Sequence, residues 1–136
     1  MTIDQILKDK GFAIISVKAG ETLAAAAQTL DGKRIGAVVA LDDDGGIIGV
    51  LSERDIVRHV ARQGAMALNL NVGDAMTRDV IKVESTSKID DALQLMTDRR
   101  IRHLPVMNDG KLVGVISIGD LVKWKIAETE AEAEAM

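Results

Sequence analysis

The sequence contains the same motif twice, and this internal repeat constrains the fold more than any local pattern does. The segment GVLSERDIV occupies Gly49–Val57, and GVISIGDLV occupies Gly114–Val122. Both have Gly, Val, an apolar residue, Ser, two variable residues, Asp and an apolar pair. Upstream, residues 14–41 align with residues 80–107 at a constant offset of 66 (80 − 14). Two such copies predict two similar halves.

Each copy predicts the same order of elements: strand, helix, strand, strand, helix. IISV and VIKV are short β-like runs, and TLAAAAQTL and KIDDALQLM have apolar residues at helical spacing, with Thr22 and Ser87 as start signals. The continuous apolar runs IGAVVAL and IRHLPVM are typical of strands buried on both faces. Turns rich in Gly and Asp follow, then IIGVLS and LVGVIS, so we expect a hairpin. The fold class is therefore α/β (α+β), with two β-α-β-β-α repeats that pack through their sheets with pseudo-twofold symmetry.

The repeats also set the expected domain boundaries. We expect residues 1–62 to form the first repeat with a short amphipathic N-terminal helix, residues 63–75 a linker, and residues 76–126 the second repeat. The Ala/Glu tail, residues 127–136, is expected to extend the last helix into solvent. One repeat alone buries too little apolar surface to be comfortably stable, so the two copies should share a core.

Composition excludes several classes of function. The 136 residues carry a formal charge of −4, which argues against a nucleic-acid-binding protein with a broad basic face. The absence of Cys excludes a thiol nucleophile, a disulfide framework and a cysteine metal site, and two His residues are too few for a histidine-rich one. Aromatic residues are limited to Phe12 and Trp124, so base stacking is not expected. Without a signal peptide or a membrane-spanning run, we expect a soluble, cytoplasmic protein.

The repeated Ser-x-x-Asp has two interpretations. Ser followed three residues later by an acidic residue at a helix start is typical of a capping box, in which both side chains satisfy backbone groups. The same groups suit a ribose phosphate: the helix N-terminus and the Ser hydroxyl can bind phosphate, and the Asp carboxylate can accept both hydroxyls of a cis-diol. A cap requires neither the preceding glycine nor a second copy, and both are present. Those two features favour ligand binding.

These elements together resemble a tandem pair of CBS domains, also called a Bateman module. The resemblance rests on GVLSERDIV and GVISIGDLV, on RIGAVVAL and RIRHLPVM upstream, and on VGDAMTRDVIKV between the copies, and it extends over residues 11–125. It implies a regulatory module that binds adenosine compounds, such as AMP, ADP, ATP, NAD(H) or S-adenosylmethionine, in two clefts between the repeats. It also implies a homodimer that pairs through its helices.

The resemblance assigns roles to individual residues. The ribose-binding residues are Asp55, Asp120, Ser52 and Ser117. The adenine pocket is Ile15, Val17, Ala26, Ile35, Gly36 and Val50 in the first copy, and Ile81, Val83, Ala92, Ile101 and Val115 in the second. Phosphate-binding candidates are Arg54, Arg100, Arg102 and His103; a solvated surface is the alternative for Arg100. Because Gly36 and Ala37 stand where the second copy has Arg102 and His103, the two clefts are expected to differ in affinity.

No catalytic constellation is recognisable in the sequence, and no metal site is predicted. The sequence lacks a Gly-x-Ser-x-Gly nucleophile motif, a phosphate-binding Walker loop and a Rossmann fingerprint. We therefore expect a non-catalytic adenosine-nucleotide sensor that signals to a separate regulated protein. A ligand-independent dimerisation or protein-interaction module is the alternative, and a nucleotide hydrolase is a weaker third.

Overall fold

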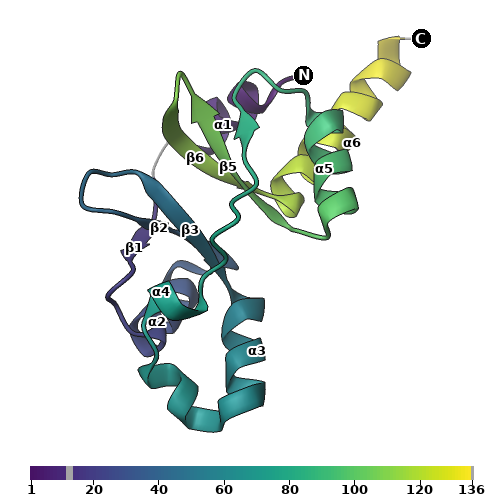
Figure 1. Ribbon diagram of the computed structural model, residues 1–136. Coiled ribbons are helices and arrows are strands. Elements are labelled where there is room, and N and C mark those ends of the chain that lie inside the picture. The colour runs from purple at the N-terminus through teal and green to yellow at the C-terminus, as the bar shows by residue number, and fades with distance from the viewer. Residues whose placement is uncertain (12–13, 136) are drawn as a thin grey trace. The chain divides into compact units, whose positions relative to one another are not determined.

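The computed structural model describes residues 1–11 and 14–135, and these form two compact units. The first unit comprises residues 15–80, and the second unit comprises residues 1–14 together with residues 81–136. In each unit a strand, a helix, a β-hairpin and a second helix follow one another, as the repeat predicts (Figure 1). Within the described residues, no helix has the combined length and apolar character needed to span a membrane.

The first unit contains a three-stranded sheet in the order β1-β2-β3. Strand β1 pairs parallel with β2, and β2 pairs antiparallel with β3. The elements are β1 (Ser16–Lys18), α2 (Leu23–Lys33), β2 (Ala37–Leu41), β3 (Ile47–Ser52), α3 (Glu53–Gln63), the 3-10 helix η1 (Gly64–Asn69) and α4 (Val72–Ala75). Four of the five residues of β2 are buried, in agreement with the continuous apolar run in the sequence.

Helix α2 begins at the predicted start signal and ends three residues beyond the predicted run TLAAAAQTL. Thr22 is the N-cap, and its hydroxyl accepts a hydrogen bond from the backbone N–H of Ala25 at 3.1 Å. Arg34 ends the helix in the left-handed conformation, with φ of 55°. Leu23, Ala26 and Leu30 are buried in the unit's aliphatic core. The side chains at helical spacing therefore attach α2 to its sheet.

The expected linker folds into the first unit. Residues 63–75 include all of η1 and α4, and Val72, Ala75 and the following Met76 lie in the core. After α4 the chain pairs with β3, because Val50 and Thr77 exchange two backbone hydrogen bonds of 2.9 Å. This segment therefore covers the first sheet rather than only connecting the repeats.

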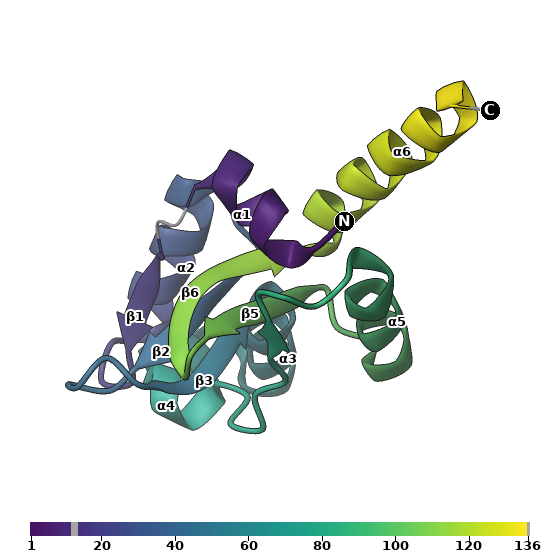
Figure 2. The ribbon, with the colours of Figure 1, turned by 90° about the horizontal axis from the view of Figure 1, so that it is seen from above.

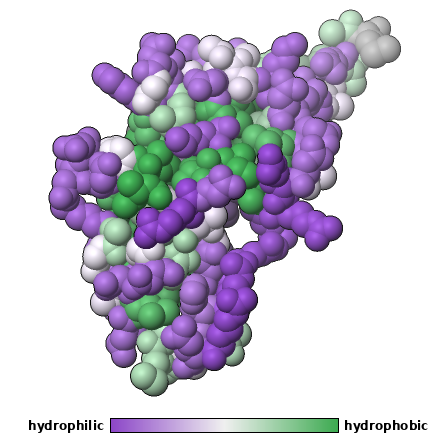
Figure 3. Space-filling model, viewed as in Figure 1, coloured by the Kyte–Doolittle hydropathy of each residue, from purple (hydrophilic) through white to green (hydrophobic). Residues whose placement is uncertain are grey.

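The second unit repeats the topology, with the sheet order β4-β5-β6. Its elements are α1 (Ile3–Lys10), β4 (Val83–Glu84), α5 (Ile89–Arg99), β5 (His103–Asn108), β6 (Lys111–Ser117) and α6 (Ile118–Ala135). Arg100 ends α5 with φ of 55°, as Arg34 ends α2. Hydrophobic surface gathers over the strands of this unit in Figure 3, whereas the end of α6 mixes hydrophilic and weakly hydrophobic residues.

The N-terminal helix packs in the second unit, although the expected boundaries placed it with the first repeat. Ile3, Ile6 and Leu7 of α1 are buried in the core of the second unit. Figures 1 and 2 both show α1 beside β6 and the start of α6. The bridge between Thr2 and Lys88 matches the bridge between Asn71 and Thr22. Helix α1 thus packs on the second sheet at the position that α4 occupies on the first.

Other sequence expectations change in detail. The N-cap of α5 is Lys88 and not Ser87. Lys88 is the residue that aligns with Thr22, the N-cap of α2, at the offset of 66, so the two helices begin at equivalent positions. Strands β1 and β4 are shorter than predicted and start later in the chain. The Ala/Glu tail continues α6 as an exposed helix to Ala135, while Met136 lies outside the described residues.

Candidate functional site

The first Ser-x-x-Asp segment forms a complete capping box where β3 meets α3. The Ser52 hydroxyl accepts a hydrogen bond from the Asp55 N–H at 3.2 Å, and Oδ2 of Asp55 accepts one from the Ser52 N–H at 3.0 Å. The structural interpretation of the motif is therefore correct for these atoms. Capping occupies Oδ2 of the carboxylate and leaves Oδ1 for other partners.

The second segment has the same reciprocal pair where β6 meets α6. The Ser117 hydroxyl accepts from the Asp120 N–H at 3.2 Å, and Oδ2 of Asp120 accepts from the Ser117 N–H at 2.9 Å. The two copies of the motif thus produce the same local geometry. The motif alone was compatible with capping and with ligand binding, and the capping hydrogen bonds are formed in both units.

The first turns of α3 and α6 already use some of their N–H groups. The Glu53 N–H donates to the carbonyl of Gly36 at 2.9 Å, and the Ile118 N–H donates to the carbonyl of Arg102 at 2.8 Å. Together with the serine caps, these bonds satisfy two first-turn donors of each helix. The helix N-termini therefore offer a phosphate fewer open donors than the sequence argument assumed.

Asp55 is the more enclosed of the two repeated acids. Its side chain is 7% exposed. Its Oδ1 lies 3.5 Å from the Thr77 hydroxyl and 3.5 Å from Nη1 of Arg58, which are long contacts for hydrogen bonds. Neither Thr77 nor Arg58 was among the predicted site residues. Only the folded chain brings Thr77 back to β3, whereas the i,i+3 spacing of Asp55 and Arg58 on α3 was a local signal for that pair.

Asp120 is more exposed and has a closer cationic partner. Its side chain is 26% exposed, and its Oδ2 lies 2.6 Å from Nζ of Lys10. Burial raises the pKa of Asp120, but the hydrogen bonds from Lys10 and Ser117 outweigh it, so that the pKa lies below its ordinary value. Lys10 was not predicted as a site residue, because it is distant in sequence and reaches Asp120 only when α1 packs in this unit.

Some of the predicted adenine-pocket residues are buried in the cores, and the others are only partly buried. Val17, Ala26, Val83 and Ala92 are buried core residues. The four isoleucines are partly buried and pack against those cores: Ile15, Ile35, Ile81 and Ile101. Gly36, Val50 and Val115 are half-buried on or beside the strands. Ala26 and Ala92, which were expected to face a ligand space, are fully buried in the cores of their units.

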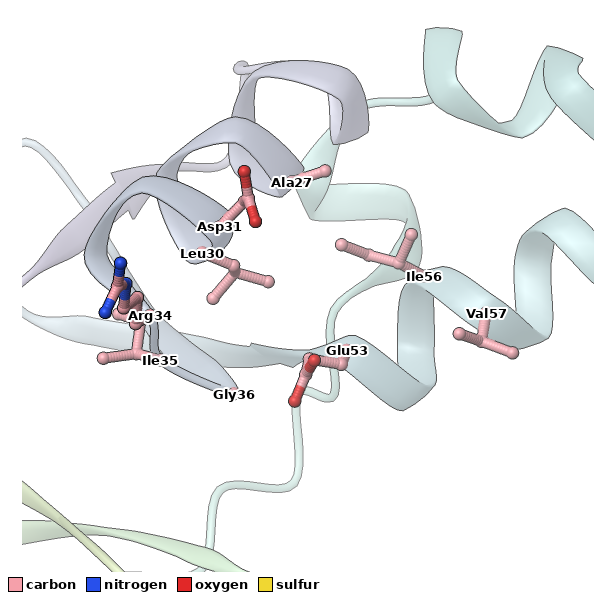
Figure 4. A pocket seen from close by; sticks show the side chains of 9 residues that line it. All are labelled: Ala27, Leu30, Asp31, Arg34, Ile35, Gly36, Glu53, Ile56 and Val57. Carbon is pink, nitrogen blue, oxygen red and sulfur yellow. The ribbon is translucent and has the colours of Figure 1, made fainter.

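A pocket of about 410 Å³ lies between α2 and α3 in the first unit (Figure 4). Among the predicted adenine residues, Ile35 and Gly36 line it. The remaining lining residues are Ala27, Leu30, Asp31, Arg34, Glu53, Ile56 and Val57. Figure 4 shows Leu30 of α2 and Ile56 of α3 on opposite sides of this space. The lining combines aliphatic side chains with the charged residues Asp31, Arg34 and Glu53.

The predicted phosphate-binding residues lie outside the cores. Arg54, Arg100 and Arg102 are exposed, and His103 is half-buried. The run IRHLPVM was predicted to be strand throughout, but Arg102 lies in a bend before β5, and His103 is the first residue of that strand. Across the described part of the chain, no group of three or more His, Asp and Glu residues could hold a metal ion.

Comparison with known proteins identifies the family. The CBS-domain family model matches residues 11–62 and 72–127. A curated relative, the mitochondrial CBS domain-containing protein CBSX3 of Arabidopsis thaliana, is 32% identical over 143 residues, which cover 99% of this chain and 69% of the relative. The chain spans 64% and 63% of the length of two further curated relatives.

Solved structures agree with the family match. The CBS-domain containing protein ATU1752 from Agrobacterium tumefaciens is 41% identical, has a TM-score of 0.90, and aligns over 92% of this chain and 99% of its own. The CBS domain pair of protein MJ0100, solved with 5′-methylthioadenosine and S-adenosyl-L-methionine, has a TM-score of 0.81 at 22% identity and aligns over 91% of this chain and 98% of its own. With two copies of the repeat, two sheets of the same topology and these similarities, the chain belongs to the CBS-domain family.

Proposed function

We propose that the protein is a non-catalytic regulatory module that binds an adenosine-containing ligand and signals to a partner protein by a conformational change. The ligand class comprises AMP, ADP, ATP and NAD(H), held at the Ser-x-x-Asp turns. The supporting observation is that one oxygen of each carboxylate caps the helix, which leaves the other oxygen for a ligand. In both copies Oδ2 of the Asp makes the cap, and among the described residues the contacts of Oδ1 of Asp55 are the two of 3.5 Å given above.

The carboxylates can therefore cap a helix and still accept a ribose hydroxyl, because each carboxylate has about four lone-pair positions. Protein MJ0100, which has the same fold, was solved with two adenosine-containing ligands. That precedent supports the chemical class and does not select the nucleotide. Arg54, Arg100, Arg102 and His103 are the proposed phosphate-binding residues, and the proposal includes no metal.

A second candidate function is ligand-independent dimerisation or protein interaction. Two observations favour it: both capping boxes are complete, and the side chain of Asp55 is 7% exposed. Val57 and Val122 are 66% and 44% exposed at equivalent positions of α3 and α6. An apolar pair on two equivalent helices suits a homodimer interface. We propose a homodimer under either function.

Thermal unfolding with AMP, ATP, NADH and S-adenosylmethionine separates the two functions. A ligand at a hundred times its Kd adds about 2.7 kcal/mol to stability. We expect at least one of these ligands to raise the Tm of the wild-type protein, and the rise to disappear in Asp55→Ala/Asp120→Ala. Thr22→Ala is the matched control, because it removes a helix cap outside the proposed sites.

The outcomes are distinct. A ligand-dependent rise in the wild type and in Thr22→Ala, but not in the Asp double variant, supports the sensor. No rise with any of the four ligands favours the interaction module. Consumption of a nucleotide, monitored in the same samples by chromatography, would contradict both non-catalytic proposals.

A further inference from the structure

Helix α1 places a lysine directly on the second repeated aspartate. Nζ of Lys10 lies 2.6 Å from Oδ2 of Asp120 and 3.0 Å from the carbonyl oxygen of Val115 on β6. All of these groups belong to the second unit. The buried residues Ile3, Ile6 and Leu7 fix α1 against the core of this unit, so the end of the helix that carries Lys10 has a defined position.

The first unit makes the equivalent contacts without a lysine. The carbonyl of Val50, the equivalent of Val115, accepts the backbone N–H of Thr77 at 2.9 Å. Asp55 faces the Thr77 hydroxyl at 3.5 Å. The difference arises because α4 ends at Ala75 and the chain then joins β3, whereas α1 continues as a helix to Lys10. A strand hydrogen bond in one unit is thus replaced by an ammonium group in the other.

This replacement changes what the carboxylate can accept. Oδ2 of Asp120 already accepts two hydrogen bonds, one from the Ser117 N–H and one from Lys10. A carboxylate oxygen has two lone-pair positions, so both positions on Oδ2 are filled. A cis-diol that binds both carboxylate oxygens needs one of them. In Asp55, Oδ2 accepts only the Ser52 N–H among the described residues, and the two contacts on Oδ1 are 3.5 Å long, so a diol hydroxyl can displace them more easily than it can displace Lys10 at 2.6 Å.

We propose that Lys10 is a specificity-determining residue that competes with a ribose cis-diol for Asp120, which makes the affinities of the two sites unequal. This inference rests on the proposed function, because it concerns the same ribose-binding carboxylates. The side chains of Lys10 and Asp120 are 44% and 26% exposed, so the lysine can move into solvent while α1 stays docked. A partly exposed ion pair is worth at most about 1 kcal/mol, so the competition changes affinity about two- to fivefold.

The test is an NMR titration of the full chain with adenosine, which is uncharged and carries the cis-diol. The amide signals of Ser117 and Asp120 report a Kd for the second unit, and those of Ser52 and Asp55 report one for the first. We expect Lys10→Met to tighten adenosine binding in the second unit about two- to fivefold and to leave the first unit unchanged. Lys8→Met is the matched control, because it removes the same charge from the same helix turn without touching Asp120.

Two further measurements address the mechanism. 2′-Deoxyadenosine lacks one hydroxyl of the diol, so Lys10→Met should not tighten its binding. Sodium chloride screens the ion pair, so the wild-type Kd for adenosine in the second unit should approach that of Lys10→Met as salt increases.

Failure of this inference is distinguishable from failure of the proposed function. If adenosine binds the second unit of the wild type and Lys10→Met leaves its Kd unchanged or weakens it, the competition is overturned while the sensor stands. An equal gain for 2′-deoxyadenosine or in Lys8→Met also overturns it, because the effect is then independent of the diol or of the contact. If neither unit of any variant binds adenosine, AMP, ADP, ATP or NADH, the proposed function and this inference both fail.

Discussion

The glycine that precedes each Ser-x-x-Asp turn is required by a neighbouring side chain. A Cβ on Gly49 would lie 2.8 Å from Cγ of Met76 and 3.0 Å from the carbonyl oxygen of Thr77. A Cβ on Gly114 would lie 2.8 Å from Cδ2 of Leu7. The repeated glycine, which favoured ligand binding in the sequence, therefore has a packing reason in both units: it lets the helix that covers the sheet approach β3 or β6.

Alanine at these glycines should destabilise both units, and Gly49→Ala more than Gly114→Ala. A Cβ at Gly49 would meet the backbone carbonyl of Thr77, which cannot move aside without shifting the chain. A Cβ at Gly114 would first meet the side chain of Leu7, and that side chain can rotate. We expect losses of about 1–3 kcal/mol in the free energy of unfolding, measured with urea. Gly32→Ala is the control, because its Cβ would meet no atom within 4 Å in an exposed stretch of α2. Equal losses in all three variants would contradict this explanation.

Asp120 predicts a pH dependence of stability. Its pKa in the folded state is below the ordinary value of 3.8, so the ionised carboxylate stabilises the fold at neutral pH. That contribution is lost as the pH falls through the folded-state pKa. We expect Asp120→Asn to cost up to about 1 kcal/mol at neutral pH and progressively less below about pH 4.

Urea unfolding across this pH range measures the effect of Asp120→Asn. The asparagine keeps an oxygen that can accept the Ser117 N–H, so the change isolates the charge. Asp79→Asn removes an equal charge at an exposed carboxylate and serves as the control. A cost of Asp120→Asn that stays constant from neutral to acidic pH would refute the assignment.

Among the elements, α1 and α4 have the same role and different lengths. Leu7 of α1 lies against Gly114, and Met76, the residue that follows α4, lies against Gly49. Helix α4 has four residues and α1 has eight. The longer helix carries Lys10 to Asp120, whereas the shorter one lets Thr77 pair with β3. Helix length therefore decides which group faces each repeated acid.

Leu7→Ala tests whether α1 is a structural part of the second unit. Leu7 is 1% exposed, and its loss should destabilise that unit by about 2–5 kcal/mol. Hydrogen exchange followed by NMR should show faster exchange in β5 and β6, while β2 and β3 keep their protection. Lys8→Ala, one residue along the same helix, is the control. Loss of protection in the first unit alone would contradict the assignment of α1.

For the molecule as a whole, the repeats leave equivalent apolar residues exposed. Val57 of α3 and Val122 of α6 occupy the same position of the motif, and Ile118 and Ile126 of α6 are 37% and 54% exposed. These residues lie on the helices that follow the Ser-x-x-Asp turns. Exposed apolar side chains on both such helices support association of two copies of the chain.

Val57→Asp/Val122→Asp should convert the proposed homodimer into a monomer. A buried carboxylate without a partner opposes association, because its desolvation is not compensated. Light scattering after size-exclusion chromatography gives the mass directly. Met66→Asp makes the same chemical change at a 75% exposed residue of η1 and should leave the dimer intact. A dimeric mass for the double variant would exclude these two helix faces as the interface.

The sequence by itself determined the repeated topology. Its apolar runs and turns predicted the strands, the hairpins and the principal helices, because these depend on local periodicity and turn chemistry. It also located the Ser-x-x-Asp turns, since a capping box is contained within four residues. Which of the two interpretations the atoms adopt was not decidable from the motif, because capping and ribose binding use the same side chains.

The tertiary structure alone decided which segments complete each unit. Residues 1–10 pack with the second sheet and residues 63–76 with the first, so the partners of Asp120 and Asp55 are Lys10 and Thr77. No local pattern encodes these pairings, because they depend on which sheet a short amphipathic helix covers. Long-range packing places chemically different groups beside two acids that the sequence makes look equivalent.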